Sequence, residues 1–267
     1  FDPTPIEQGI NVYYTNLNYG EIDFAIIEDR KFKSGPKDKI PYQGPRPDHI
    51  LNPEYNSKDI DISGLKLLGD RQLDFLKSWS VKSKKNTMKA LLSATSFCGA
   101  AHLHGKQSNR LHADLDSNGW PQTGRNKALK IVKKANAVHI GGDQHLASIV
   151  HHGIDDFEDG PFQFIVPALV NNYYSRWWWP EDEKPGENSN KKLPWTGRYL
   201  DGFSNKITMH AYANPDSPSS GAGYGMVLFN KEKNNVTFEC WPRFGDVSKK
   251  GAKQFKGWPH IVDLNLT

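Results

Sequence analysis

Apolar side chains recur every three to four positions between residues 124 and 135, which is the clearest periodic pattern in the chain. Ala128 and Val132 fall on one face and lysines fall on the other, so the pattern predicts an amphipathic helix. We expect Arg125 to lie on the polar face with the lysines. Asn136 follows the last apolar position and is a typical helix stop.

A second helical pattern runs from Asp70 to Trp79, with Leu73 and Leu76 on the same face as Trp79, and we expect Asp70 to cap this helix. Short apolar or alternating runs predict the strands. The predicted strands are residues 10–15, 22–28, 88–95, 137–140, 162–170, 207–213, 224–230 and 236–241. Helices between the early strands, followed by a β-rich last third, are typical of an α/β (α+β) chain.

The predicted strand 137–140 ends at a Gly141-Gly142 break, which is followed by Asp143 and His145. Glycines let the backbone turn sharply at the tip of a strand and approach an ion closely. Carboxylate and imidazole together suit a hard or borderline metal ion. The two residues are therefore candidate metal ligands. The alternative is that an Asp-x-His triplet occurs by chance, because the chain contains 10 histidines.

Three segments are predicted to be loops, and each has two interpretations. Residues 33–58 contain five prolines and are either a long ordered loop or an insertion. Residues 98–118 carry three histidines, which either approach a metal or belong to a polar loop. Residues 171–195 are rich in tyrosine and tryptophan, so they either line a ligand cleft or pack against the body of the protein.

Composition narrows the class of protein. With 267 residues, the chain is long enough for one large domain or two small ones. No apolar run approaches the roughly 18 residues of a membrane span. The net charge is only +4 and the basic residues are scattered, so no nucleic-acid readout is expected. Cys98 and Cys240 form either one bridge or two buried thiols. The chain starts at Phe1 without a leader, and we expect it to be a mature or internal piece of a longer protein.

Several short motifs occur in the order found in a known family. They are Glu28-Asp29-Arg30, Leu68–Leu76, Ala90–Phe97, Asp116-Ser117-Asn118-Gly119-Trp120, Arg125 near the start of a helix, and Gly142-Asp143-Gln144-His145. With this order and spacing, the chain resembles the alkaline phosphatase D-like (PhoD-like) metallophosphatases of the calcineurin-like metallophosphoesterase superfamily. The resemblance covers roughly residues 10–245.

This resemblance implies a four-layer αββα sandwich, in which two facing sheets are flanked by helices. The early metal-ligand motifs of the superfamily, such as Asp-x-His and Gly-Asn-His-Asp, do not occur before residue 100. We therefore expect residues 1–267 to be mainly the C-terminal part of a single PhoD-like domain, complete only with a missing N-terminal segment. The segments 33–58 and 171–200 are expected to be long loops of that domain.

The resemblance also implies roles for individual residues. The D-like family carries Gly-Asp-x-His at the last strand-end motif, so Asp143 and His145 are expected to bind metal, one to each of two ions. Arg30 is expected to stabilise phosphoryl oxygens, because its planar fork matches phosphate. Alternatively, Arg30 forms a salt bridge with Asp29 or another structural carboxylate. Calcium with iron, zinc or manganese would all suit these ligands.

The activity implied by the resemblance is metal-dependent hydrolysis of phosphate monoesters or diesters, in a secreted, periplasmic or cell-surface protein. The expected partners are a phosphate ester substrate and the N-terminal half of the same protein. The alternative is a non-catalytic relative that acts as a structural or ligand-binding module through the aromatic segment 171–195. A third hypothesis, a carbohydrate-binding β-rich protein, depends on the tryptophan content alone.

Overall fold

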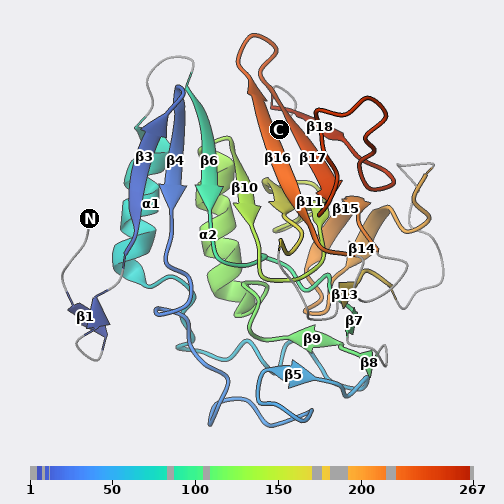
Figure 1. Cartoon of the computed structure of the whole chain (residues 1–267). Coiled ribbons are helices and arrows are strands. Elements are labelled where there is room, and N and C mark those ends of the chain that lie inside the picture. Colours follow the sequence, from blue (N-terminus) through green and yellow to red (C-terminus); the bar gives the residue numbers. More distant parts are fainter. Residues whose placement is uncertain are drawn as a thin grey trace.

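The fold is known from a computed structural model that describes residues 5–7, 10–11, 13–82, 87–104, 109–169, 176–180, 192–214 and 221–264. Its largest element is an eight-stranded mixed sheet (Figure 1). The strands follow the order β14 (Gly197–Leu200), β15 (Lys206–Tyr212), β11 (Ser148–His152), β12 (Phe162–Ile165), β10 (Ala137–Gly141), β6 (Met88–Leu92), β4 (Ile22–Ile26) and β3 (Thr15–Tyr19).

The direction of the strands brings several loops to one edge of this sheet. Strands β4, β6, β10 and β12 pair in parallel, whereas β3, β11, β14 and β15 run antiparallel to their neighbours. The carboxyl ends of β4, β6 and β10 therefore lie side by side, at the lower edge of the sheet in Figure 1. Binding sites of α/β proteins gather at such an edge.

Two helices cover one face of the main sheet, as Figure 1 shows. Helix α1 spans Asp70–Val81 and helix α2 spans Gln122–Lys134. Their apolar faces form a buried cluster with the sheet, in which Leu76 and Leu129 meet Leu91. Burial of such side chains contributes about 1.5–3 kcal/mol each. No helix within the described residues is long and apolar enough to cross a membrane.

A three-stranded sheet packs against the opposite face of the main sheet. It consists of β16 (Gly223–Asn230), β17 (Asn235–Pro242) and β18 (His260–Asp263). Phe238 from β17 packs against Phe164 from β12, with ring centroids 5.2 Å apart. The described residues thus form a helix–sheet–sheet arrangement. Cys98 and Cys240 are both buried free thiols, which decides between the two expectations.

Short strands complete the edge where β4, β6 and β10 end. Strand β5 (His49–Ile50) pairs with β9 (Ala113–Asp114), and β7 (Leu103–His104) pairs with β8 (Asn109–Arg110) and β13 (Arg176–Trp177). A further pair, β1 (Pro5–Glu7) and β2 (Ile10–Asn11), lies near the N-terminus. The expectation that 98–118 is a loop without strands is therefore wrong, because β7, β8 and β9 lie within it.

Other sequence-based predictions differ from the structure in detail. The first strand of the hairpin is not at 10–15 but at β3, because the turn at Gly20 and Glu21 sets its register with β4. The N-cap of α1 is Gly69, and Asp70 is its first helical residue. Asn136 has a φ of 48°, a left-handed conformation that ends a helix, as expected.

Arg125 is the largest departure from the predicted pattern, because it is buried and not on the solvent face. Its guanidinium donates to the carbonyl oxygens of Phe97 at 2.8 Å and Gly153 at 3.0 Å, and to Nδ1 of His152 at 3.1 Å. A buried charge needs such partners. Phe97 and Gly153 lie in the loops that follow β6 and β11, and His152 is the last residue of β11, so Arg125 joins α2 to both strand ends.

The hydrogen bond from Arg125 determines which ring nitrogen of His152 carries the proton, in a buried chain of polar side chains. His152 accepts at Nδ1, so its neutral ring donates from Nε2 to Oε1 of Gln163. The same oxygen accepts from the backbone N–H of Phe97, so the Nδ1 of His139, 3.1 Å away, also donates to it. Nε2 of His139 lies 2.5 Å from the hydroxyl oxygen of Ser93, and this hydroxyl donates to the carbonyl of Thr95 at 2.7 Å.

Three further histidines form an aromatic cluster across β11, β15 and β18. His151 stacks on Phe162, and His210 lies 5.0 Å from His260 between ring centroids. Nε2 of His210 is buried and has no hydrogen-bond partner among the described residues. Burial, together with His260 and His151, lowers the pKa of His210 to about 3, although Glu158 opposes this shift. The ring is therefore neutral near pH 7.

His210→Phe is expected to flatten the acid dependence of stability. The native pKa of His210 lies below its ordinary value of 6.5, so the unfolded chain takes up a proton as pH falls from about 6.5 to 3, and stability falls with it. Replacing His210 with phenylalanine should lower the slope of the unfolding free energy against pH by up to about 1.4 kcal/mol per pH unit. Urea unfolding between pH 7.5 and 4.5 measures it. Above pH 7 the two slopes should coincide. An equal slope below pH 6 would contradict the prediction.

Candidate active site

Asp29 lies at the carboxyl edge of the main sheet, three residues after β4, and is 1% exposed. Its carboxylate accepts hydrogen bonds from the backbone N–H groups of Ala94 at 3.2 Å and Thr95 at 3.4 Å, and from the side-chain amide of Asn118. Burial raises the pKa of Asp29 even though these bonds favour the charged form. A nearby cation would therefore be strongly favoured.

The segment after β4 is held in place by helix α1. Gln72 is buried; its Oε1 accepts from the backbone N–H of Glu28 at 2.7 Å and its Nε2 donates to the carbonyl of Glu28 at 2.8 Å. This pair of bonds fixes the backbone that carries Asp29 and Arg30. The sequence pattern of α1 does not reveal this contact, because Gln72 is a polar residue of the helix.

Arg30 lies between two carboxylates at this edge. Its guanidinium is 2.8 Å from Asp116 and 3.5 Å from Asp143, measured between nitrogen and oxygen. Burial opposes the charge, but Asp116, Asp143 and Asp29 together raise the pKa of Arg30 above its ordinary value. The side chain is 39% exposed, so a solvent-borne anion can reach it. The salt bridge expected as the alternative role of Arg30 is thus observed, and its main partner is Asp116 and not Asp29.

Asp143 and His145 follow β10 on a tight turn, as expected from the two glycines. The N–H of Gly142 donates to the carbonyl of Ala94 at 3.3 Å, which ties this turn to the end of β6. Asp143 has a φ of 69° and His145 a φ of 54°, a region that residues other than glycine seldom occupy. Such backbone geometry is costly and clusters at functional sites.

Lys33 organises the third loop of this edge. Its ammonium donates to the three carbonyl oxygens of residues 115–117 at 2.6–2.7 Å. Burial lowers the pKa of Lys33 to about 8, although the carboxylates of Asp116 and Asp114 oppose this shift. The bonds fold the loop so that Asp116 reaches Arg30 and Asn118 reaches Asp29. Sequence reasoning gave no role to Lys33.

We call Asp29, Arg30, Asp116, Asn118, Asp143 and His145 the strand-end site. Oδ1 of Asn118 is buried there without a hydrogen-bond partner among the described residues, while its amide nitrogen donates to Asp29. A buried unpaired oxygen is costly unless something else satisfies it. Carboxylate and amide oxygens with an imidazole are suitable ligands for a divalent or trivalent ion. The donor types of the site therefore suit a metal, although among the described residues no three of its carboxylate and imidazole ligand atoms lie within 4.8 Å of one another.

A different group has the closest spacing for a metal. Among the described residues, Asp48, His49 and Asp114 are the one set of three whose ligand atoms all lie within 4.8 Å of each other, and it does not include Asp143 or His145. Arg46 contacts Asp48 at 2.7 Å, and Arg176 contacts Asp114 at 2.6 Å. Two guanidinium groups thus already neutralise these carboxylates.

Other candidates from the sequence are not part of the strand-end site. His102 is buried and His112 is half-buried, whereas the side chain of His104 lies outside the described part. In the aromatic segment, Trp178 is fully buried and Trp179 packs on Trp195 with centroids 4.4 Å apart. This part of the segment packs against the body, while Tyr173 and Tyr174 lie outside the described residues.

Comparison with known proteins identifies the family. The model of the family described as PhoD-like phosphatase matches residues 2–174. The chain belongs to the PhoD-like phosphatase family. No curated protein matches it. Among solved structures, that of PhoD is similar, with a TM-score of 0.54 and 13% identity, over 98% of this chain and 44% of that chain.

Two consequences follow from these matches. The stretch matched to the PhoD-like family contains every residue of the strand-end site. The chain also spans less than half the length of the solved PhoD chain. The resemblance inferred from the motifs is confirmed. At 13% identity, the structural match supports the fold alone.

Proposed function

We propose that the complete protein hydrolyses phosphate monoesters or diesters at the strand-end site, with the help of bound metal ions. Membership of the PhoD-like phosphatase family supports the reaction class. One observation supports the location: an exposed guanidinium, Arg30, lies between Asp116 and Asp143, beside the buried carboxylate of Asp29.

The residues that would hold metal are Asp29, Asn118, Asp143 and His145. Metal at this position supplies positive charge to phosphoryl oxygens and lowers the pKa of a bound water towards 7. Asp29 and the unpaired oxygen of Asn118 are both buried, so they would face a cation in a medium of low dielectric. Calcium with iron, zinc or manganese is compatible with these ligands.

Arg30 would bind the phosphoryl group. Its planar fork offers parallel donors that match two oxygens of a phosphate. Asp116 already accepts from one side of this fork, which orients the guanidinium and leaves the weaker 3.5 Å contact to Asp143 free to change. His145, on its strained turn, would be positioned by the backbone of that turn.

The rest of the protein would complete the fold. We propose that residues 1–267 form the C-terminal part of one PhoD-like domain and that a further helical layer, from an N-terminal segment, makes a four-layer αββα sandwich. The share of the solved PhoD chain that is matched, 44%, supports this. That segment would also contribute further metal ligands. Export from the cytoplasm is part of the same proposal.

Asp143→Asn in the complete protein tests this function. We expect kcat/KM for bis-p-nitrophenyl phosphate to fall about a hundredfold and metal content to fall with it, because a ligand charge is lost. Plasma mass spectrometry counts the metal. Asp74→Asn, on the exposed face of α1, is the control and should change neither quantity. Unchanged turnover and metal content in Asp143→Asn would leave the alternative, a non-catalytic relative.

A further inference from the structure

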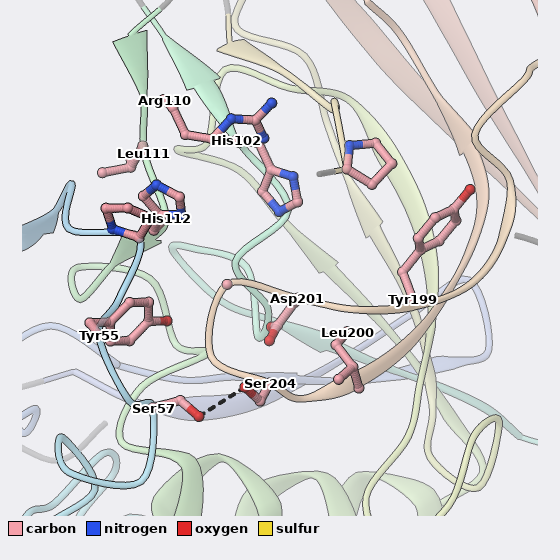
Figure 2. Close-up of a pocket in the computed structure, with 13 residues that line it drawn as sticks. Tyr55, Ser57, His102, Arg110, Leu111, His112, Tyr199, Leu200, Asp201 and Ser204 are labelled. Atoms are coloured by element: carbon pink, nitrogen blue, oxygen red, sulfur yellow. Dashed lines mark hydrogen bonds between the residues drawn. The ribbon is translucent and has the colours of Figure 1, made fainter. Parts of the chain in front are cut away.

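A cavity of about 250 Å³ lies at the same end of the main sheet as the strand-end site. Residues from three parts of the chain line it: the 53–57 loop, His102 with Arg110–His112, and the turn from Tyr199 to Ser204 (Figure 2). A cavity of this size holds one ring-sized group and not a chain of several rings.

The turn that forms one wall of the cavity is rigid. The buried carboxylate of Asp201 accepts from the backbone N–H groups of Gly99 at 2.8 Å, Phe203 at 2.9 Å and Asn205 at 2.8 Å. At Gly202 a β-carbon would lie 2.1 Å from the carbonyl oxygen of His112, so only glycine permits this approach. The wall is therefore set before any ligand arrives.

The groups that face the cavity combine hydroxyls with aromatic rings. The hydroxyls of Ser57 and Ser204 are 2.8 Å apart, and each can both donate and accept. Figure 2 shows the rings of Tyr55 and Tyr199 on opposite sides of the space above them. Burial lowers the pKa of His102 to about 4, so this ring is neutral near pH 7.

This lining selects against two other classes of ligand. The hydroxyls of Ser57 and Ser204 pair with each other, so a purely apolar ring would leave one hydroxyl proton of this pair without an acceptor, which is costly once water is excluded. A strongly anionic group would meet a single guanidinium, that of Arg110, which already donates to the carbonyl of Trp179 at 2.7 Å. A neutral ring with several hydroxyls satisfies the serines and stacks on the tyrosines.

The cavity is next to the strand-end site. Strand β13 joins them, because the N–H of Arg176 donates to the carbonyl of His145, and the carbonyl of the next residue, Trp177, accepts from the N–H of His102. Along the other wall, His112 and Asp116 are four residues apart, so their Cα atoms are at most about 14 Å apart. The two places are therefore connected through β13 and through the segment 112–116.

We propose that the cavity is a subsite for the sugar ring of a sugar phosphate, whose phosphoryl group lies at the strand-end site. This inference rests on the proposed function and gives its substrate class. The hydroxyls of Ser57 and Ser204 hold the sugar hydroxyls, and Tyr55 and Tyr199 contact its faces. Phosphate esters without a ring bind through the phosphoryl group alone.

The test fills the cavity in the complete, metal-loaded protein. Leu200 lines the cavity and is 57% exposed, so Leu200→Trp blocks the space with little effect on the core. Leu228→Trp, at a 45% exposed position on β16, is the matched control. Ser57→Ala is a second, milder variant. Saturation-transfer NMR with ribose 5-phosphate reports binding of the ring, and turnover of ribose 5-phosphate is compared with that of methyl phosphate.

We expect Leu200→Trp to weaken the ring signals and to lower kcat/KM for ribose 5-phosphate at least about tenfold, with methyl phosphate unchanged. Ser57→Ala should have the same pattern with a smaller effect. Equal ring signals in Leu200→Trp, Leu228→Trp and the parent would overturn the subsite. Ring binding that depends on Leu200, without turnover of either ester, would support the subsite and contradict the proposed function.

Discussion

Asp29→Asn is expected to lower kcat/KM for phosphodiester hydrolysis about a thousandfold, the largest effect of any single substitution at the site. Both carboxylate oxygens accept hydrogen bonds: Oδ1 from the N–H of Ala94, and Oδ2 from Thr95 and Asn118. In asparagine, an NH2 group replaces one of the two carboxylate oxygens, so a donor would face another N–H donor. Charge is lost and the turn that carries Asn118 is displaced.

The same substitution should reduce the free energy of unfolding by about 1–3 kcal/mol, because a buried donor is left unpaired. Steady-state kinetics and urea unfolding separate the two effects. Asp23→Asn is the matched control, since Asp23 is also buried and lies on β4 at the opposite edge of the sheet. Kinetics of Asp29→Asn that resemble those of Asp23→Asn would show that hydrolysis does not take place at the strand-end site.

Arg125→Met is expected to reduce the free energy of unfolding by about 3–5 kcal/mol, although the two side chains are similar in length. The carbonyl oxygens of Phe97 and Gly153 would lose their donors inside the protein. Nδ1 of His152 would also lose the bond that fixes its proton. Urea unfolding at pH 7.5 measures the loss.

Lys127→Met is the control for this experiment, because Lys127 is an exposed residue of the same helix. Its effect should stay within about 0.5 kcal/mol. A loss in Arg125→Met no larger than in Lys127→Met would mean that the buried hydrogen bonds of the guanidinium contribute nothing. The comparison separates those bonds from the general effect of removing a positive charge from α2.

Periodicity predicted the helices and most strands because packing against a sheet imposes it. Leu76 and Trp79 of α1 and Ala128 and Val132 of α2 are buried as the pattern requires. Periodicity placed Arg125 wrongly, because this argument assigns a polar residue to the solvent face by default. Its acceptors lie in loops 28 residues away in both directions, which no local pattern encodes.

The residues of the candidate site also differ in how clearly the sequence reveals them. Asp143 was recognisable because two glycines precede it at the end of an apolar strand. The sequence indicates Asp29 only as part of a motif and as an alternative salt-bridge partner of Arg30, and its observed partners Ala94 and Asn118 are 65 and 89 residues away. Bonds over such separations arise from the order of strands in the sheet, and one sequence does not contain that order explicitly.

Lys33 has a consequence for how the loop at 115–117 responds to ions. A bare loop whose carbonyls converge has to become ordered when a metal arrives, and the affinity is reduced by that loss of freedom. Here an ammonium from the chain itself already satisfies the carbonyls. The pKa of Lys33 is lowered to about 8, so its ammonium is mostly charged at pH 7 and holds the loop through these bonds. Under the proposed function, metal binding would therefore not have to order this loop.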